Sequence, residues 1–385
     1  MDMIYLDYAA TTPVAPRVLD AMLPYFRESF GNPSSVHRYG QRAEAAVEEA
    51  REAVAAALHC HPDEVIFTSC GSESDNLALR GAAQAMSEGS GRKWILTSKT
   101  EHHAVSKTAE QLAGHYGFLL EWLDVDEHGM VRPETVEKAI CDKTALVSVM
   151  YANNEIGTIN PIREIAEICH QHGMLFHTDA VQAAAYLDVN VEKLGMDLMS
   201  LGGHKFYGPK GVGALYVRKE TKLIPHLTGG GQEYGLRAGT QNVPYIVGFA
   251  KALQLAAEER EQRVAHMKPL RDQIIGRVLE EISDSKLTGH PENRLPNHAS
   301  FVFKDVDGNL LLQLLDSAGF ACSSGSACKT GNPEPSEVIT SLGFSREWAL
   351  GSLRITLGVD STAEHVEAFL NTLPSLVEKT RHLIS

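Results

Sequence analysis

The first two thirds of the chain alternate short apolar runs with longer segments of helical pattern, and this alternation limits the possible folds most strongly. Three apolar runs each precede a segment whose apolar residues recur at helical spacing: 64–69, 94–98 and 145–152. Three further runs have the composition of buried strands: 175–179, 197–202 and 213–218. The pattern predicts an α/β domain whose large, mostly parallel sheet carries helices on both faces.

The pattern changes near residue 244, which predicts a second domain. Two long helical stretches follow, the second of them at 268–282, and short strand-like runs then precede a final amphipathic helix. We therefore expect a large domain over 14–255 and a smaller α+β domain over 256–385. Residues 1–13 are expected to pack with the smaller domain.

The composition excludes several classes of function. The chain has 385 residues, with 35 Lys and Arg against 49 Asp and Glu and a formal net charge of -14, and an acidic surface repels nucleic-acid phosphates. It has no run of about eighteen apolar residues and no signal-peptide pattern at its start. Six cysteines in so long a chain do not resemble a disulfide framework. We expect reduced thiols in a cytoplasmic protein without membrane or nucleic-acid partners.

Polar residues that follow the predicted strands are candidate ligands of a bound molecule, because ligands gather at the carboxyl ends of parallel strands. Gly71 and Ser72 follow the first strand, and a helix that begins with a glycine and a hydroxyl suits a phosphate. Ser72 with Asp75 also fits a helix-capping pattern, which needs no ligand. Asp179 ends another strand, with Gln182 close behind. Asp179 could bind a metal, act as a base, hold a protonated nitrogen or only cap a helix.

A glycine-rich stretch, "GGHKFYGPKG", surrounds Lys205. Gly203 and Gly208 resemble the ends of a P-loop, but Gly211 stands where Ser or Thr belongs and a strand follows instead of a long helix. A lysine in a loop is usually only a solvated residue. Together with a phosphate cradle, Asp179 and the histidine pair in "TSKTEHHAV", however, Lys205 completes the set that pyridoxal phosphate requires.

The motifs resemble those of the cysteine desulfurases, which are pyridoxal-phosphate enzymes of the class V aminotransferase family with the aspartate-aminotransferase fold, fold type I. The resemblance spans residues 5–358 and rests on ten motifs in family order: "YLDYAATTP", "FGNPSSVHRYG", "FTSCGSESDN", "TEHHAV", "ANNEIG", "HTDAVQ", "GGHKFYGPKG", "RAGTQNV", "SSGSAC" and "LRITLG". The motif "SSGSAC", on a long loop at about 321–336, is similar to the first group of this family, the NifS/IscS-like enzymes.

The resemblance implies a role for each matching residue. Lys205 would hold the cofactor covalently, Asp179 would pair with the ring nitrogen and His102 would stack on the ring. Further contacts are implied as follows: the phosphate for Gly71, Ser72, Gly202, Gly203 and His204, the phenolic oxygen for Gln182 and Asn154, the substrate carboxylate for Asn154 and Arg354, and a neighbouring protomer's phosphate for Thr240. A homodimer with shared sites is therefore implied.

The implied reaction converts L-cysteine to L-alanine and leaves the sulfur on Cys328 as a persulfide. Lys205 would take the Cα proton, which requires its pKa to fall by about three units from about 10.4. Cys328 also needs activation, because a thiol with a pKa near about 8.5 is mostly protonated at neutral pH, and His102 and the substrate are both candidates. Small residues around Cys328 predict a mobile loop. Cys322 ends an apolar run and is expected to be packed, and Cys70 is also expected to be structural.

Alternatives remain open at this stage. An aminotransferase or a selenocysteine lyase of the same fold would also use Lys205, Asp179 and Arg354. A sulfur- or metal-handling scaffold would use the "HCH" motif at 59–61, but the C-x5-C spacing that ends at Cys328 fits no common zinc pattern. We predict no resident metal, with Cys328 as a candidate transient iron–sulfur ligand. A sulfur-acceptor protein is an implied partner, in iron–sulfur assembly, tRNA thiolation or DNA sulfur modification.

Overall fold

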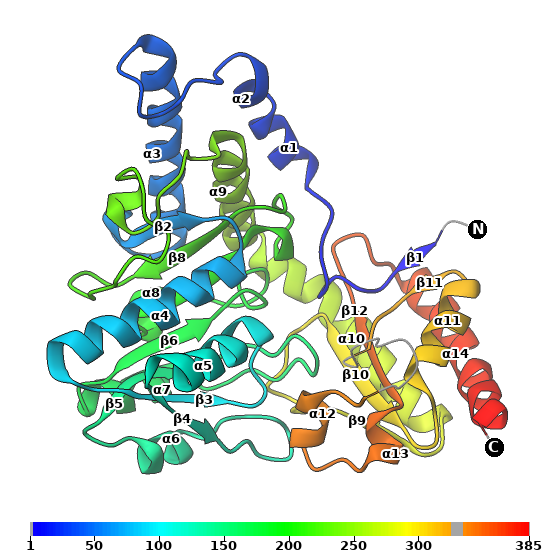
Figure 1. The fold of residues 1–385 in the computed structure, drawn as a ribbon. Coiled ribbons are helices and arrows are strands. Elements are labelled where there is room, and N and C mark those ends of the chain that lie inside the picture. The colour runs from blue at the N-terminus through cyan, green and yellow to red at the C-terminus, as the bar shows by residue number, and fades with distance from the viewer. Residues whose placement is uncertain (1–2, 325–333, 385) are drawn as a thin grey trace.

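The computed structural model of the chain describes residues 3–324 and 334–384. Its largest element is a seven-stranded sheet in the order β2-β8-β7-β6-β5-β3-β4 (Figure 1). The strands have these bounds: β2 (Val65–Thr68), β3 (Trp94–Ser98), β4 (Leu119–Leu123), β5 (Thr144–Ser148), β6 (Leu175–Asp179), β7 (Leu198–Gly202) and β8 (Gly213–Val217). Within this sheet β8 alone runs in the direction opposite to the other six strands. The predicted large, mostly parallel sheet is confirmed.

Helices cover both faces of the sheet. On one face α4 (Gly71–Ser90) and α5 (His103–Tyr116) pack their apolar sides against sheet residues such as Ile95 and Leu146. On the other face the main core includes Phe176 of the sheet and the apolar sides of three helices: α3 (Arg38–Leu58), α7 (Ile162–Gln171) and α9 (Val243–Glu258). Shorter helices complete this part of the chain: α1 (Pro16–Met22), α2 (Pro24–Arg27), α6 (Pro133–Ala139) and α8 (Val191–Leu194).

The C-terminal part of the chain builds a smaller, antiparallel sheet in the order β12-β10-β9. Its elements have these bounds: β9 (Ser285–Leu287), β10 (His298–Phe303), β12 (Ser352–Thr356), α10 (Arg260–Glu281), α11 (Gly308–Ser317), α12 (Glu337–Ser341), α13 (Arg346–Ala349) and α14 (Ala363–Ile384). The start of the chain joins this part, because β1 (Ile4–Tyr5) pairs with β11 (Phe320–Ala321). The helix α10 begins before the expected residue 268 and contains Pro269.

The parallel strands position the candidate site. Strands β2, β3, β5, β6 and β7 run in one direction, so their carboxyl ends meet at one edge of the sheet. The segments that leave these ends carry most of the predicted site residues. Among the described residues, no helix is both long and apolar enough to cross a membrane.

The turn between β2 and α4 differs from the capping pattern expected from the sequence. The N-cap of α4 is Cys70, whose Sγ accepts a hydrogen bond from the backbone N–H of Glu73 (3.4 Å). Ser72 therefore lies inside the first helical turn and does not cap the helix. The capping role predicted for Ser72 with Asp75 is wrong, because the helix begins at Gly71 and Asp75 is fully buried.

Candidate active site

The carboxyl ends of the parallel strands surround a cavity of about 330 Å³. The cavity brings together most of the residues that the sequence singled out, although they come from widely separated segments. These predicted residues line it: Gly71, Ser72, His102, Asn154, Asp179, Gln182, His204, Lys205 and Arg354. The contacts of each group indicate what the cavity can bind.

Asp179 and His102 lie side by side in the cavity. The Asp179 carboxylate accepts a hydrogen bond from the backbone N–H of Val181 (2.9 Å). Burial raises the pKa of Asp179, while His102 and Lys205 oppose this rise. The Nδ1 atom of His102 accepts the backbone N–H of Ala104 (3.1 Å), and in the neutral ring this places the proton on Nε2. His102 is therefore a hydrogen-bond donor through Nε2, and desolvation in the cavity lowers its pKa.

Lys205 follows β7 in a short 3-10 turn, Gly203–Lys205. Its Nζ donates to the carbonyl oxygens of Ala9 (2.6 Å) and Ala10 (2.8 Å) in the segment after β1. Burial, and then the charge of Arg354, lower the pKa of Lys205 to about 8. This change is in the direction that the sequence argument required for a lysine acting as a base.

Arg354 of β12 joins three segments at the cavity wall. Its Nη1 donates to the backbone oxygen of Asn154 (2.9 Å) and its Nη2 to Asp7 Oδ1 (2.7 Å). The Arg354 Nε is buried and has no partner among the described residues. The guanidinium is thus held in place at the cavity wall, and its planar fork of donors suits a carboxylate ligand.

The residues fit pyridoxal phosphate. Gly71 opens the 20-residue helix α4 at the cavity, so backbone N–H groups and the helix dipole favour a phosphate there. A Cβ atom on Gly71 would lie 2.7 Å from Val181 Cγ2, so the cradle depends on this glycine. A Cβ on Gly202 would lie 3.4 Å from the Gly71 nitrogen, which puts Gly202 directly behind the cradle.

Six lining residues were assigned no part in the cavity from the sequence, and Asp75 and Cys70 are the two of them with an ionisable side chain. The Asp75 carboxyl is buried, and its Oδ1 has no hydrogen-bond partner among the described residues. One ligand atom each of Asp75, His102 and Asp179 lies within 4.8 Å of the others. Burial and the nearby Asp179 raise the pKa of Asp75 well above its usual range. Burial beside Asp179 therefore favours the protonated form of the Asp75 carboxyl.

The Asp75 side chain lies against a polar network beneath the cavity. His177 Nε2 lies 3.7 Å from Asp75 Oδ1 and 3.0 Å from Ser200 Oγ, and its Nδ1 lies 2.8 Å from Ser148 Oγ. Burial lowers the pKa of His177 to about 3, so this ring is neutral. Cys70, which was expected to be only structural, is the second such residue, since it also lines the cavity. The N-cap geometry of α4 was needed to reveal its position.

Four predicted residues do not line the cavity, and the first, Gly202, lies behind the phosphate cradle as described above. Gly203 packs behind the cavity, where a Cβ would meet Phe249 at 3.1 Å. Thr240 is exposed in the loop before α9 and does not belong to the described lining of its own cavity. Cys328 lies outside the described residues. Cys322, expected to be packed, is partly buried against the main core.

Comparison with known proteins identifies the family to which the chain belongs. The sequence pattern of the class V aminotransferases matches residues 4–369. The cysteine desulfurase IscS of Dictyoglomus turgidum is 47% identical, over 98% of this chain and 95% of that protein. The cysteine desulfurase IscS of Methanosarcina thermophila is also 47% identical, over 99% of this chain and 93% of that protein.

Solved structures give the same result. A NifS-like protein superimposes with a TM-score of 0.91 and 38% identity, covering 98% of this chain and 100% of that one. The structure described as SspA in complex with cysteine has a TM-score of 0.80 and 36% identity, over 92% of this chain and 98% of that one. The fold and the cavity therefore define a pyridoxal-phosphate enzyme of fold type I.

The chain belongs to the class V aminotransferase family and, within it, to the cysteine desulfurases, the enzymes of sulfur mobilisation. The resemblance, the fold class and the cofactor inferred from the sequence are confirmed. The roles of the individual site residues stay predictions.

Proposed function

We propose that the enzyme converts L-cysteine to L-alanine and transfers the sulfur to Cys328. In this reaction one C–S bond breaks and one S–S bond forms. The hydrogen that the Cys328 thiol gives up ends on the methyl group of alanine, so no oxidant or reductant is consumed. Family membership supports this proposal, and so does the similarity to SspA, whose solved structure is a complex with cysteine.

Several residues would hold pyridoxal phosphate, which supplies an electron sink for charge developing at the substrate Cα. Gly71 and Ser72 would bind the phosphate at the start of α4, and Asp179 would hold the proton on the ring nitrogen. His102 would lie against the ring face. Gln182 is already fixed by a hydrogen bond from its Nε2 to the Ala9 carbonyl (2.9 Å).

The remaining cavity residues would act on the substrate. Arg354 and Asn154 would bind and orient its carboxylate. Lys205 has its pKa lowered to about 8, so a useful fraction of its amine is unprotonated near neutral pH and can take the Cα proton. His102 carries a proton on Nε2 and can hold or release it at the substrate sulfur.

One observation carries the assignment of Cys328: one described end of its loop pairs with Arg354 of the cavity, and the other is bound to Glu155, the neighbour of the cavity residue Asn154. The backbone of Ser323 exchanges hydrogen bonds with that of Arg354 (2.7 and 3.3 Å), and Ser336 Oγ donates to Glu155 Oε2 (2.5 Å). A fully extended chain spans about 3.3 Å per residue, so five residues can cover about 17 Å. The length of chain between Ser323 and Cys328 is therefore compatible with sulfur transfer from the cavity.

The test is to assay alanine and sulfide formation from L-cysteine with the wild type, Cys328→Ser and the matched control Cys322→Ser. We expect Cys328→Ser to lose most of its alanine formation and Cys322→Ser to keep it. Transamination or alanine formation that persists undiminished in Cys328→Ser would favour an aminotransferase or a selenocysteine lyase instead.

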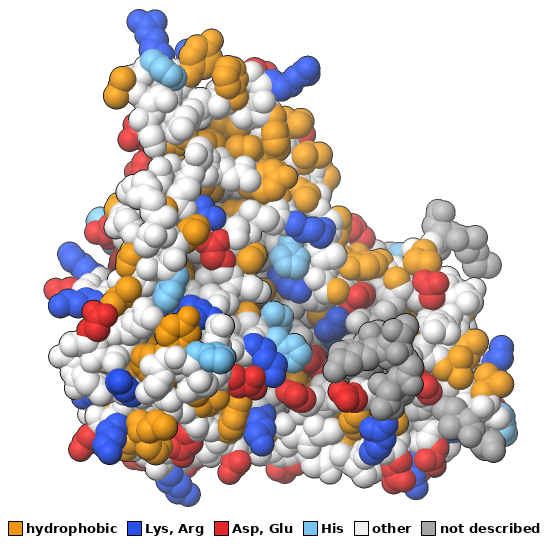
Figure 2. Space-filling view, viewed as in Figure 1, with side chains coloured by type: hydrophobic (Ala, Val, Ile, Leu, Met, Phe, Trp, Pro, Cys, Tyr) orange, Lys and Arg blue, Asp and Glu red, His pale blue; other side chains and the backbone are white. Residues whose placement is uncertain are grey.

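We also propose that the enzyme is a homodimer in which Thr240 reaches the neighbouring protomer's cofactor phosphate. Thr240 is exposed and away from its own cavity. Figure 2 shows hydrophobic side chains gathered over α1 and α2, and a monomer rarely exposes such a patch. Exposed apolar residues of this region include Leu19, Leu23, Phe26, Phe30, Val36 and Tyr39. Gel filtration of the wild type and of Phe26→Glu tests this, and a monomeric wild type would contradict it.

Partners and location complete the proposal. A sulfur-acceptor protein would take the sulfur from Cys328 in the cytoplasm, where thiols remain reduced. Cys60, Cys70, Cys141, Cys169 and Cys322 are all free, which supports a reducing compartment. We further propose that the small domain, 1–13 with 256–385, folds as a unit beside the large one, 14–255.

A further inference from the structure

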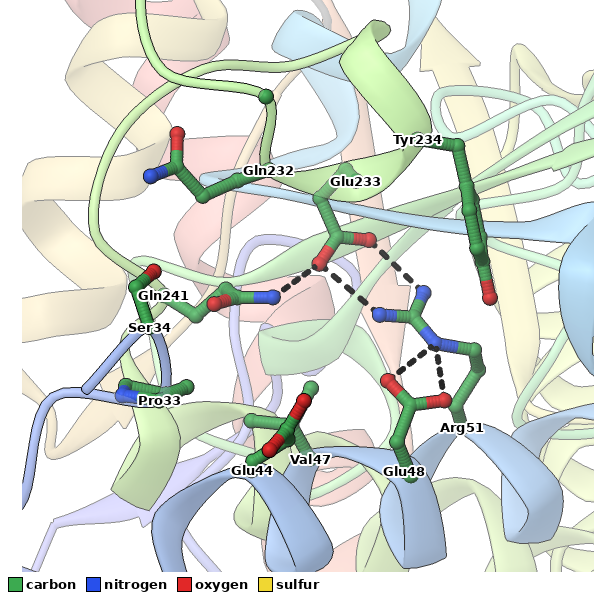
Figure 3. Close-up of a pocket in the computed structure, with 11 residues that line it drawn as sticks. Pro33, Ser34, Glu44, Val47, Glu48, Arg51, Gln232, Glu233, Tyr234 and Gln241 are labelled. Carbon is green, nitrogen blue, oxygen red and sulfur yellow. Dashed lines mark hydrogen bonds and ion pairs between the residues drawn. The ribbon is translucent and has the colours of Figure 1, made fainter. Parts of the chain in front are cut away.

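A buried ion pair lies beneath the loop that carries Thr240. We call residues 229–242 the Thr240 loop. Arg51 of α3 donates from Nη1 to Glu233 Oε2 (2.8 Å) and from Nη2 to Glu233 Oε1 (3.0 Å). The two side chains are only 2% and 1% exposed. Figure 3 shows this pair at the side of a pocket between α3 and the Thr240 loop.

Glu233 uses its remaining acceptor capacity to connect the Thr240 loop to the sheet. Its Oε2 also accepts the backbone N–H of Phe67 in β2 (2.8 Å). Its Oε1 also accepts Nε2 of Gln241 (3.0 Å), the residue directly after Thr240, as Figure 3 shows. One carboxylate therefore links a rigid strand, a helix and the neighbour of Thr240.

The residue before Thr240 is held in a similar way. The backbone N–H of Gly239 donates to Gln232 Oε1 (3.0 Å). Gln232 and Glu233 are adjacent in the chain, so both neighbours of Thr240 are fixed by one short segment. The exposed Thr240 side chain is thus held in place through its backbone and is free to contact another molecule.

The backbone at Glu233 needs an external restraint. Glu233 and Tyr234 have φ values of 48° and 57°, in the left-handed region that residues with a Cβ rarely occupy. Such conformations persist when the surroundings impose them, and they cluster at functional sites. Arg51 supplies this restraint, since its guanidinium also lies 5.1 Å from the Tyr234 ring and 5.0 Å from the Phe67 ring.

We propose that Glu233, fixed by Arg51, is a positioning residue that sets Thr240 for the neighbouring protomer's cofactor phosphate. The inference rests on the proposed action of Thr240 across the dimer. A hydroxyl must lie within a few tenths of an ångström of its ideal distance to donate well. A loop without the Glu233–Gln241 contact would not hold Thr240 to that tolerance.

The first experiment measures the affinity of the cofactor-free enzyme for pyridoxal phosphate by visible absorbance. Gln241→Leu removes the link to Glu233 and leaves the ion pair intact, so we expect binding to weaken about fivefold to tenfold. Gln254→Leu is the matched control, because Gln254 also donates to a glutamate, Glu258 (2.9 Å), but on α9. Unchanged affinity in Gln241→Leu would overturn the proposal.

Mixed dimers distinguish positioning across the interface from a local effect. In a dimer of Gln241→Leu with Lys205→Ala, the intact Lys205 receives Thr240 from the protomer with the normal loop. We expect this site to retain cofactor as tightly as the wild type during dialysis. A site that loses cofactor as readily as in the Gln241→Leu homodimer would overturn the proposal. A Gln241→Leu enzyme that elutes as a monomer on gel filtration would also overturn it.

A parallel pair separates failure of this inference from failure of the proposed function. Thr240→Val mixed with Lys205→Ala tests only whether Thr240 acts across the dimer. If that mixture regains wild-type affinity and the Gln241→Leu mixture does not, Glu233 does not position Thr240, although Thr240 still acts across the dimer. If neither mixture regains it, the action of Thr240 across the dimer fails as well.

Discussion

The cofactor cavity and the Thr240 loop position functional side chains in different ways. In the cavity, Asp179 is the last residue of β6 and Lys205 lies in the turn after β7, and the backbone hydrogen bonds between these parallel strands fix where each strand ends. In the Thr240 loop, the backbone is irregular and its position depends on the side chains of Arg51 and Glu233. A position set by a sheet should survive the loss of a neighbouring side chain, whereas one set by a single ion pair should not.

The two regions also differ in whether their buried ionisable side chains are neutral or charged. At the cavity and in the network beneath it, burial raises the pKa of Asp75 and lowers that of His177, which favours the neutral form of both groups. The loop instead buries a charged pair, because Arg51 and Glu233 neutralise each other with two hydrogen bonds. Four substitutions test this comparison, and they are ordered by the size of the expected effect.

The largest effect is expected from Asp179→Asn, which keeps the shape of the side chain but removes the charge that, on the proposed mechanism, would hold the ring nitrogen protonated. We expect alanine formation to fall by about 10²- to 10⁴-fold while bound cofactor, followed by visible absorbance, is retained. Asp75→Asn is the control, since an amide can replace a neutral acid, and it should keep most activity. Equal losses in the two variants would show that Asp75 is not neutral.

Arg51→Met should cause the next largest effect. It leaves Glu233 buried without its counter-ion, and we expect the free energy of unfolding to fall by about 3–5 kcal/mol. Arg237→Met is the control, because Arg237 pairs with Glu73 (2.8 Å) where both side chains are partly exposed. The free energy of unfolding of Arg237→Met should fall by about 1 kcal/mol or less. Denaturant unfolding measures both, and similar losses would contradict the special role of the buried pair.

His177 should make the cavity region sensitive to acid. Its pKa is about 3 in the folded protein and about 6.5 in the unfolded chain, so between these values the unfolded chain binds a proton that the folded protein does not. Stability from this group is therefore full above pH 6.5 and declines as the pH falls toward 3, by about 2 kcal/mol between pH 6.5 and 4.5. Over the same pH range, the free energy of unfolding of His177→Gln should fall by about 2 kcal/mol less than that of the wild type.

The exposed His115 supplies the control for this pH series. His115→Gln changes an exposed residue of α5 and leaves the buried network around His177 intact, so it should keep the acid dependence of the wild type. Urea unfolding at pH 6.5, 5.5 and 4.5 compares the three proteins. Identical pH dependence in wild type and His177→Gln would mean that His177 is not buried as a neutral ring.

The smallest effect is expected from Ser72→Ala in the phosphate cradle. Loss of one hydroxyl donor should weaken cofactor binding about fivefold, since the backbone N–H groups of α4 remain. Ser90→Ala removes a hydroxyl at the opposite end of the same helix and is the control. A much larger loss in Ser72→Ala would show that the cradle depends on this side chain rather than on the backbone.

The sequence predicts the cavity better than the loop, for a physical reason. Strands and helices repeat at fixed periods, so the residues at strand ends, such as Asp179 and Lys205, can be located from local pattern alone. Asp75 was misread as part of a cap because a helix boundary can shift by one or two residues, and here Cys70 occupies the N-cap.

The Arg51–Glu233 pair could not be predicted from such patterns. Its members are 182 residues apart, and a charged residue in a sequence is usually solvated. No local period connects them, so only the three-dimensional structure brings them together. The position of Cys328 in "SSGSAC" was predicted by family resemblance, and its structural setting lies outside the described residues.

The central claim is that Cys328 receives the sulfur of L-cysteine. The most direct measurement is mass spectrometry of cysteine-containing peptides after a single turnover with L-cysteine, with alkylation to trap persulfides. We predict that the Cys328 peptide gains the mass of one sulfur atom while the Cys70 and Cys322 peptides do not. Sulfur on Cys70 or Cys322 instead, or alanine formed with Cys328 unmodified, would contradict the account.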